Sequence, residues 1–306
     1  MYQSILVPLD GSEFSARALP TAAAIARRTG ATLHLVVVFD PSAMLHFAPG
    51  EASIPAFDAT MINSRCAELR AWVEEQAGSI ANTGVPALGE FLEGTVVEAL
   101  AEQALATAAD LVVMTTHARG GMDRLRIGSV AASFLGRCHI PVFLVRPDSA
   151  NAPRPGYELP SGRLMVTLDG SAFGESILPH ASRFASATGM TLALVHVAEP
   201  VANPLSLFGA DALVAEDFVS SDEEATAAIY LATQAARLEK GTTPQTKVLS
   251  DNSPARAIVN YAHAAEPGAI AIATHGRSGL MRLIVGSVAD QVLQGVEQPV
   301  LVYRPS

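Results

Sequence analysis

The 306-residue chain contains two copies of one sequence pattern, and this duplication constrains the fold more than any single motif does. Residues 5–41 and 164–200 are identical at 18 of 37 aligned positions. Residues 115–147 and 273–305 are identical at 15 of 33 positions, and both segments end in P-V-x-x-x-R-P. Because the agreement spans long segments at a nearly constant offset, a whole folding unit has been duplicated. The chain is therefore expected to form two similar domains.

The segment between the two copies has the composition of a linker. Residues 148–162 are rich in Pro, Gly and Ser and have no apolar periodicity. The first domain is therefore placed at residues 1–147 and the second at residues 163–306, and both lengths fall within the usual domain size of roughly 100–200 residues. Apolar residues make up 49% of the chain and charged residues 16%, a balance typical of globular proteins.

Within each copy, short apolar runs alternate with segments of helical periodicity. In the first copy, the runs predicted to be strands are residues 5–9, 32–39, 88–92, 111–115 and 141–145. The helices are predicted from a cap at Ser12 to a stop at Gly30, then at about residues 60–80, 96–106 and 129–136. Continuously apolar strands that alternate with helices indicate a parallel sheet covered on both faces. The expected fold class is α/β, with two doubly wound, five-stranded, Rossmann-like domains in tandem.

Two features of each copy are expected to meet at the carboxyl end of its sheet, where ligands bind in folds of this kind. Asp10, or Asp169 in the second copy, ends the first strand, and the fourth strand leads through a glycine turn into a helix. A carboxylate can accept a hydrogen bond from a ribose hydroxyl or an adenine amine, and a helix N-terminus binds phosphate. Structural roles stay open for both features, because the aspartates can cap helices and the glycines can form ordinary turns.

Composition and spacing argue against several other functions. No G-x-G-x-x-G follows the first strand, and the two lysines, Lys240 and Lys247, do not follow glycines, so the usual dinucleotide fingerprint and the P-loop are both absent. The two cysteines form no disulfide framework and no metal-ligand spacing. The net charge of −10 is shared equally between the halves, so no basic surface for nucleic acid is expected. No apolar run approaches the ~18 residues of a membrane span or the pattern of a signal peptide, so a cytoplasmic protein without membrane contact is expected.

The second glycine turn carries a motif of a known family. Ala273-Thr274-His275-Gly276 is followed by nine residues and then by Gly286-Ser287-Val288. At these residues the chain resembles the universal stress protein family, and the resemblance covers nearly the whole chain as a tandem pair. Nucleotide-binding members of that family carry G-x-x-G-x(9)-G-[S/T] after the fourth strand, and Ala273 replaces only the first of these glycines. The resemblance implies ATP as the ligand and a non-enzymatic role in stress response or regulation.

The resemblance also implies which residues contact ATP. In the second copy they are Asp169, Val197, Ala273, Gly276, Gly286, Ser287 and Val288; the first-copy equivalents are Asp10, Val38, Thr115, Gly128, Ser129 and Val130. Because no lysine is placed to hold phosphate, Ser129, Ser287, Arg119 and Arg277 are the side chains expected to assist the backbone there. The first copy has Ala118 in place of Gly276, and a methyl group at a position with positive φ costs on the order of 1 kcal/mol. The second copy is therefore expected to be the better ATP site.

Two other function classes stay open. The chain could be a slow ATPase or an adenylyl-transfer enzyme, although no base, phosphate-binding lysine or metal-ligand cluster is evident. It could also be an interaction module whose first domain binds no nucleotide. The paired His117 and His275 have no catalytic partner at a recognisable spacing and are expected to be structural or to line the pocket.

The last strand of each copy is short and apolar, so the two copies are expected to cover these edges as an intrachain pseudo-dimer, with a homodimer as a further possibility.

Overall fold

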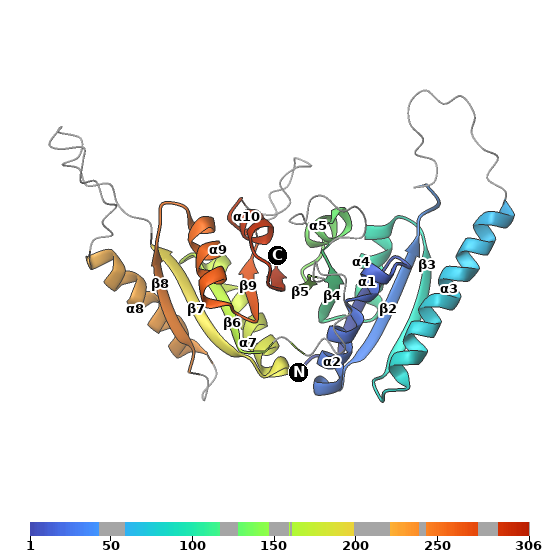
Figure 1. Ribbon diagram of the computed structural model, residues 1–306, viewed down its shortest axis with the longest axis horizontal. Helices are drawn as coiled ribbons and strands as arrows, with labels where there is room; N and C mark the ends of the chain where they lie inside the picture. The colour runs from blue at the N-terminus through green and yellow to red at the C-terminus, as the bar shows by residue number, and fades with distance from the viewer. Residues whose placement is uncertain are drawn as a thin grey trace, which may run out of the picture. The chain divides into compact units, whose positions relative to one another are not determined.

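The computed structural model describes residues 1–42, 59–116, 128–146, 159, 161–198, 221–238, 243–274 and 287–305. The chain divides into two compact units, Met1–Leu159 (unit 1) and Pro160–Ser306 (unit 2), and each unit contains one copy of the repeat. Each unit is built on parallel strands that alternate with helices, as Figure 1 shows. The α/β fold class and the tandem organisation predicted from the duplicated sequence are confirmed.

Unit 1 has the topology expected of a doubly wound sheet. Its elements are β1 (Ser4–Leu9), α1 (Glu13–Ala16), α2 (Leu19–Thr29), β2 (Thr32–Phe39), α3 (Ala59–Ala81), β3 (Ala87–Glu93), α4 (Val96–Ala106), β4 (Leu111–Thr115), α5 (Ser129–Leu135) and β5 (Val142–Val145). The strands are parallel and lie in the order β3-β2-β1-β4-β5. The direction of this order reverses between β1 and β4, which makes their carboxyl ends the topological switch point.

Unit 2 repeats this topology. Its elements are β6 (Arg163–Leu168), α6 (Ala172–Glu175), α7 (Ile177–Thr188), β7 (Thr191–Ala198), α8 (Ser221–Arg237), β8 (Gln245–Ser250), α9 (Pro254–Ala265), β9 (Ala269–Ala273), α10 (Ser287–Gly295) and β10 (Val300–Tyr303). The parallel order is β10-β9-β6-β7-β8. The switch point of unit 2 therefore lies between β6 and β9, at the positions equivalent to β1 and β4.

The core of each unit is formed by the central strands. Every residue of β1 is buried, and so is every residue of β6 after Arg163. The edge strands β3 and β8 are only partly covered. Because β3 and β8 each carry charged or polar side chains, such as Glu90 and Lys247, the prediction of continuously apolar strands holds for the centre of each sheet but not for its edges.

The first helix of each copy is divided into two, whereas the sequence predicted a single helix. In unit 1, α1 ends at Ala16 and α2 begins at Leu19, with Pro20 in its first turn. Proline fits a first turn because its missing N–H would have no intrahelical partner there. The predicted cap is present, since the Ser12 hydroxyl accepts a hydrogen bond from the Ser15 N–H at 3.1 Å. Gly30 ends α2 in the left-handed conformation, as predicted.

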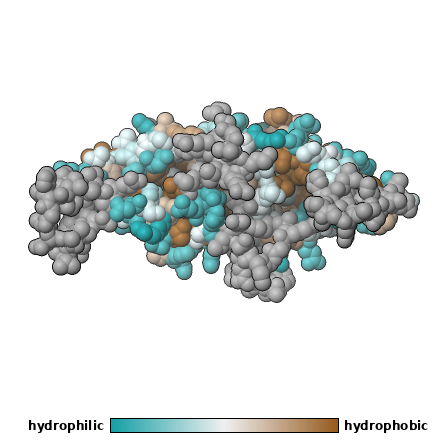
Figure 2. Space-filling view, turned by 90° about the horizontal axis from the view of Figure 1, so that it is seen from above, coloured by the Kyte–Doolittle hydropathy of each residue, from teal (hydrophilic) through white to brown (hydrophobic). Residues whose placement is uncertain are grey.

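The helices of the described residues differ from membrane-spanning helices in length or charge. None of the described helices combines the length and the apolar character that a membrane crossing requires. The 23-residue α3 is long enough, but it carries charged residues such as Arg65, Glu68 and Arg70. On the face drawn in Figure 2, hydrophilic and hydrophobic side chains are interspersed over the described residues.

The close contact between α3 and β3 depends on one glycine and gives a testable prediction. A Cβ on Gly89 would lie 2.6 Å from the carbonyl oxygen of Val73, whereas a Cβ on Gly78, inside α3, would have no neighbour within 4 Å among the described residues outside its own helix backbone. Gly89→Ala is expected to lower the free energy of unfolding by about 1–3 kcal/mol, because backbone must move. Gly78→Ala should raise it by about 0.5–1 kcal/mol. Urea denaturation of the full chain measures both, and equal effects would contradict this packing.

Candidate functional site

Each unit has an Asp-Gly-Ser turn at the carboxyl end of its first strand. Asp10 follows β1, and its Oδ1 accepts hydrogen bonds from the Ser12 N–H at 3.0 Å and the Ser12 hydroxyl at 2.5 Å. Asp169 follows β6 and accepts the same two bonds from Ser171, at 3.0 and 2.6 Å. Each aspartate therefore has the structural role that the sequence left open, because it shapes the turn that begins a helix. All four of these bonds use the Oδ1 atom of the aspartate.

The strands that flank these turns bring other predicted residues to the same edge. In unit 1, β1 pairs with both β2 and β4, so Asp10 lies next to the strand ends that carry Val38 and Thr115. In unit 2, β6 pairs with β7 and β9, which carry Val197 and Ala273 at their ends. These four strand-end residues are half-buried, whereas Asp169 is exposed. Half-buried residues beside a carboxylate can pack against a ligand while the carboxylate binds its polar groups.

The helix that follows the fourth strand begins beside the end of that strand in unit 1. The Gly128 N–H donates a hydrogen bond to the Thr116 carbonyl, so the two ends of the segment between them meet. Gly128 is the N-cap of α5 and provides no side-chain cap. Ser129 is exposed and Val130 is half-buried. The predicted phosphate-binding end of this helix therefore lies at the carboxyl edge of the sheet.

In unit 2, the corresponding helix differs in charge. α10 begins at Ser287, and the next residue, Val288, is 36% exposed. Its first turn contains Asp290, whose carboxylate accepts a hydrogen bond from the Gln294 amide at 2.7 Å. An acidic residue in the first turn complements the helix dipole, so it offsets part of the positive field that a phosphate would use.

Several predicted residues lie outside the part of the chain that the structure describes. They are Arg119, Gly276, Arg277 and Gly286, together with the compared residues His117, Ala118 and His275. The side chain of Ser287 is likewise outside the description. The contacts expected from these residues, and the comparison of Ala118 with Gly276, stay predictions.

The two Asp-Gly-Ser turns have different neighbours. Gly11 has a φ of +79°, and a Cβ there would lie 2.5 Å from Leu69 Cδ2 and 3.7 Å from Arg65 Nη2, both on α3. Gly170 has a φ of +81°, but among the described residues a Cβ there would meet only His196 Cε1, at 3.9 Å. Both positions favour glycine because of their positive φ. The turn of unit 1 is thus tightly covered by α3, whereas no described helix approaches Gly170 as closely.

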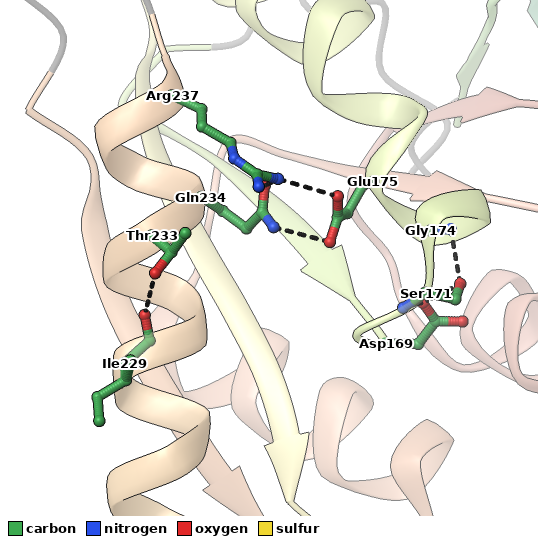
Figure 3. A network of polar contacts seen from close by, with 8 residues as sticks. All are labelled: Asp169, Ser171, Gly174, Glu175, Ile229, Thr233, Gln234 and Arg237. Carbon is green, nitrogen blue, oxygen red and sulfur yellow. Dashed lines mark hydrogen bonds and ion pairs between the residues drawn. The ribbon is translucent and has the colours of Figure 1, made fainter.

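A polar network next to Asp169 occurs in unit 2 and joins α6 to α8 (Figure 3). Glu175 Oε1 accepts a hydrogen bond from the Gln234 amide at 2.7 Å, and Glu175 Oε2 lies 3.5 Å from Arg237 Nη1. Gln234 is 3% exposed, whereas the Arg237 side chain is 64% exposed. The buried member of the network is therefore an amide and the charged donor is largely in solvent. Ala16 is the aligned residue of unit 1, so the same carboxylate is absent there.

Tyr230 on α8 completes the surroundings of the Asp169 turn. Its hydroxyl oxygen is buried. Burial raises the pKa of Tyr230 most, the charge of Glu175 and a hydrogen bond to Glu175 raise it further, as does the charge of Asp169, and a hydrogen bond from the Gly170 N–H lowers it. The ring also packs edge-on against His196, with 5.3 Å between the ring centroids. The hydroxyl therefore stays protonated at neutral pH and is a hydrogen-bond donor.

Sequence reasoning missed two groups of polar residues at these edges. Asp40 follows β2, and its Oδ1 accepts hydrogen bonds from the Ser42 N–H at 2.9 Å and the Ser42 hydroxyl at 2.6 Å. Its Asp-x-Ser spacing repeats that of Asp10 and could have revealed this second turn. The second group is the Glu175 network, and no local spacing in the sequence could have revealed it. Within the described ranges, no three His, Cys, Asp or Glu side chains are grouped so that they could hold a metal ion.

Comparison with known proteins identifies the family. The model described as "Universal stress protein family" matches residues 1–146 and 161–304, and the chain belongs to this family. A universal stress protein of Mycobacterium tuberculosis (strain ATCC 25618 / H37Rv) is 30% identical over 217 residues, which cover 71% of this chain and 68% of that protein. Universal stress protein E of Escherichia coli (strain K12) is 22% identical over 317 residues, covering 100% and 95% of the two chains.

A solved structure shows the same fold over almost the whole chain. The crystal structure of a universal stress protein from Archaeoglobus fulgidus DSM 4304 has a TM-score of 0.68 and 16% sequence identity, and the match covers 99% of this chain and 96% of that one. Together with the two family matches, this likeness confirms a tandem two-domain member of the family. The protein is therefore a stress-response protein of the universal stress protein family.

Two substitutions in the Glu175 network compare how much a buried hydrogen bond and an exposed ion pair each contribute to the free energy of unfolding. Gln234→Ala removes a buried donor and leaves Glu175 Oε1 unpaired, which should cost about 1–3 kcal/mol of unfolding free energy. Arg237→Ala removes a charged but largely exposed partner of the same carboxylate and should cost about 0–1 kcal/mol. Urea denaturation of both variants compares them directly. Equal losses, or a larger loss for Arg237→Ala, would show that the ion pair dominates the network.

Proposed function

We propose that this universal stress protein binds ATP without turning it over and acts as a nucleotide-dependent stress-response or regulatory protein. The observation that carries the proposal is the meeting of three groups at the switch point of unit 1, of which the first two also meet in unit 2. These groups are the aspartate turn, the half-buried end of the second strand and the start of the helix after the fourth strand. A carboxylate, an apolar wall and uncapped helix N–H groups suit the ribose or amine, the base and the phosphates of a nucleotide.

The proposed contacts are those that the family resemblance implies. In unit 2 they are Asp169, Val197, Ala273, Gly276, Arg277, Gly286, Ser287 and Val288, and in unit 1 they are Asp10, Val38, Thr115, Arg119, Gly128, Ser129 and Val130. We propose unit 2 as the tighter site because Gly276 stands where unit 1 has Ala118. The tight cover of Gly11 by Leu69 adds support, since it leaves less room beside Asp10.

An enzyme of low activity is the second candidate function. It would be a slow ATPase or an adenylyl-transfer enzyme acting on the same nucleotide. The sequence favours binding without turnover, because phosphoryl transfer depends on positioned charge and neither lysine follows a glycine-rich loop. We also propose a cytoplasmic location, in keeping with the sequence expectation.

ATP titration tests the proposed site and its inequality. Gly276→Ala is expected to weaken the tighter site about tenfold, which corresponds to 1.4 kcal/mol, and Ala118→Gly should strengthen the weaker one. Asp169→Asn and Asp10→Asn remove one carboxylate charge each while keeping an oxygen for the turn, so they report on binding with little loss of fold. Isothermal titration calorimetry measures the two affinities. Two wild-type sites of equal affinity would contradict the proposed inequality. Tight binding that depends on Asp10 rather than Asp169 would reverse the assignment of the tighter site. Turnover of ATP at ~1–100 per second would favour the enzyme.

A second prediction concerns the last strand of each unit. β5 and β10 end the strand orders of their own units, and Val142–Val145 and Val300–Tyr303 are apolar apart from the tyrosine hydroxyl. Because apolar edge strands associate unless they are covered, we propose that the two copies pair as an intrachain pseudo-dimer, with a homodimer as the alternative. Residues 1–147 and 163–306, expressed separately, should self-associate or bind each other in sedimentation velocity. Halves that stay monomeric after mixing would contradict the pairing.

A further inference from the structure

The outer face of α8 in unit 2 is exposed and uncharged. α8 packs against β7 and β8, and Ala227 and Leu231 are buried on that side. The exposed residues between the two ends of the helix are Ala225, Thr226, Ala228, Ile229, Ala232, Thr233 and Ala236. Ile229 is 67% exposed, and Figure 3 shows its side chain pointing away from Glu175. Because a surface helix ordinarily turns charged and polar side chains to water, this face differs from one that is built to stay in solvent.

The two threonines of this face use their hydroxyl protons inside the helix. The Thr226 hydroxyl donates to the Asp222 carbonyl at 2.7 Å, and the Thr233 hydroxyl donates to the Ile229 carbonyl at 2.8 Å. Hydroxyls bonded in this way offer a partner their methyl groups rather than a donor. The middle of the face is therefore suited to apolar packing.

The duplicated helix of unit 1 shows that the fold does not require an uncharged face. Leu69 and Val73 of α3 are buried at the positions aligned with Ala227 and Leu231 of α8. In the same alignment, the exposed residues of α3 that stand in place of Ala228, Ala232 and Thr233 are Arg70, Glu74 and Glu75. The two helices thus have the same role in their units but different outer faces. The uncharged face is a feature of unit 2.

Charged residues of opposite sign lie at the two ends of the α8 face. Asp222 is exposed in the first turn, and the side chain of Arg237 in the last turn is 64% exposed. At ~1.5 Å per residue, they lie about 10 Å and about 12 Å from Ile229, in opposite directions along the helix. At about 3.6 residues per turn, both lie on the same side of a line drawn along the helix through Ile229. The face is therefore nearly symmetric in length about Ile229 and opposite in charge at its ends.

We propose that this face of α8 is an interface that binds the same face of a second copy of the chain. The two helices pair antiparallel, with the twofold axis beside Ile229, so that the two Ile229 side chains contact each other. Asp222 of each copy then lies at the level of Arg237 of the other copy, on the same side of the pair. The inference goes beyond the proposed function and does not depend on nucleotide binding.

The charge pattern favours a second copy, and favours the antiparallel arrangement. A twofold axis places a surface against itself, so a face with opposite charges at equal distances from its centre is complementary to its own copy. A parallel pair would instead place Asp222 against Asp222 and Arg237 against Arg237. Because a guanidinium carries five N–H donors, Arg237 can bind the second copy and keep its contact with Glu175.

Sedimentation velocity of the full-length protein over a range of concentrations tests the interface. The wild type is expected to form a reversible dimer, and Ile229→Lys should weaken it at least about tenfold, because an apolar contact is lost from each copy. Lysine reduces the net charge of −10, so general repulsion between chains cannot explain the loss. Ala71→Lys, at the aligned exposed position of α3, is the matched control and should leave the dimer unchanged.

Two further sets of variants test the antiparallel arrangement. Arg237→Glu should weaken the dimer about threefold to tenfold, since like charges then face each other in two places, and adding Asp222→Arg should restore it to within about twofold. Under mild oxidation, Ile229→Cys should form a disulfide between chains, because the twofold axis places residue 229 against its own copy. Ala236→Cys is the control and should not form one, since the two copies of residue 236 lie about 20 Å apart along the pair.

The possible outcomes separate this interface from other modes of association. A chain that stays monomeric at every concentration would overturn the inference. A dimer that survives Ile229→Lys would also overturn it and would assign association to another surface, such as the last strands. Equal loss in Ala71→Lys, no rescue by the exchanged charges, or cross-linking at residue 236 as efficient as at residue 229 would each contradict the antiparallel α8 pair. Urea midpoints within the wild-type range confirm that each variant is folded.

Discussion

The parallel pairing of each first strand with two neighbours is the constraint on which the rest of the structure depends. β1 pairs with β2 and β4, and β6 pairs with β7 and β9. Since parallel strands all end at one edge, this pairing alone brings together residues that lie about 100 positions apart in the sequence. The largely buried central strands stabilise the edge, and the Asp-Gly-Ser turns place a carboxylate on it. The candidate sites are consequences of this topology.

Duplication has kept the scaffold of the two units and changed the groups around their turns. Both aspartates accept the same pair of hydrogen bonds from a serine two residues later. Around Asp10, a leucine and an arginine of α3 approach the turn, whereas the charges of Glu175 and Asp169 both act on the half-buried Tyr230 in unit 2. Two sites with one backbone and different surroundings are suited to differ in ligand preference. This physical difference supports unequal sites independently of the glycine turns.

The sequence predicted most of the fold because its local signals agree with the global topology. The bounds of β2, α4 and β4 match the apolar runs and turn formers residue for residue. The break between α1 and α2 was missed because apolar spacing continues across it. The Glu175 network was not predictable, because Glu175 and Gln234 are 59 positions apart and no local spacing encodes their contact. The strand-end positions of the predicted site residues follow from local features, because strand ends and turns are encoded locally, whereas what surrounds them is set by packing.

The central claim is that the carboxyl ends of the strands at each switch point bind an adenine nucleotide. Native mass spectrometry of the intact chain, as purified and across added ATP, tests it most directly because it counts bound nucleotides on each chain. The account predicts a complex with one nucleotide at low ATP concentration and with two at higher concentration, and the first to appear should be lost in Asp169→Asn. A folded chain that carries no nucleotide at any ATP concentration would contradict the account.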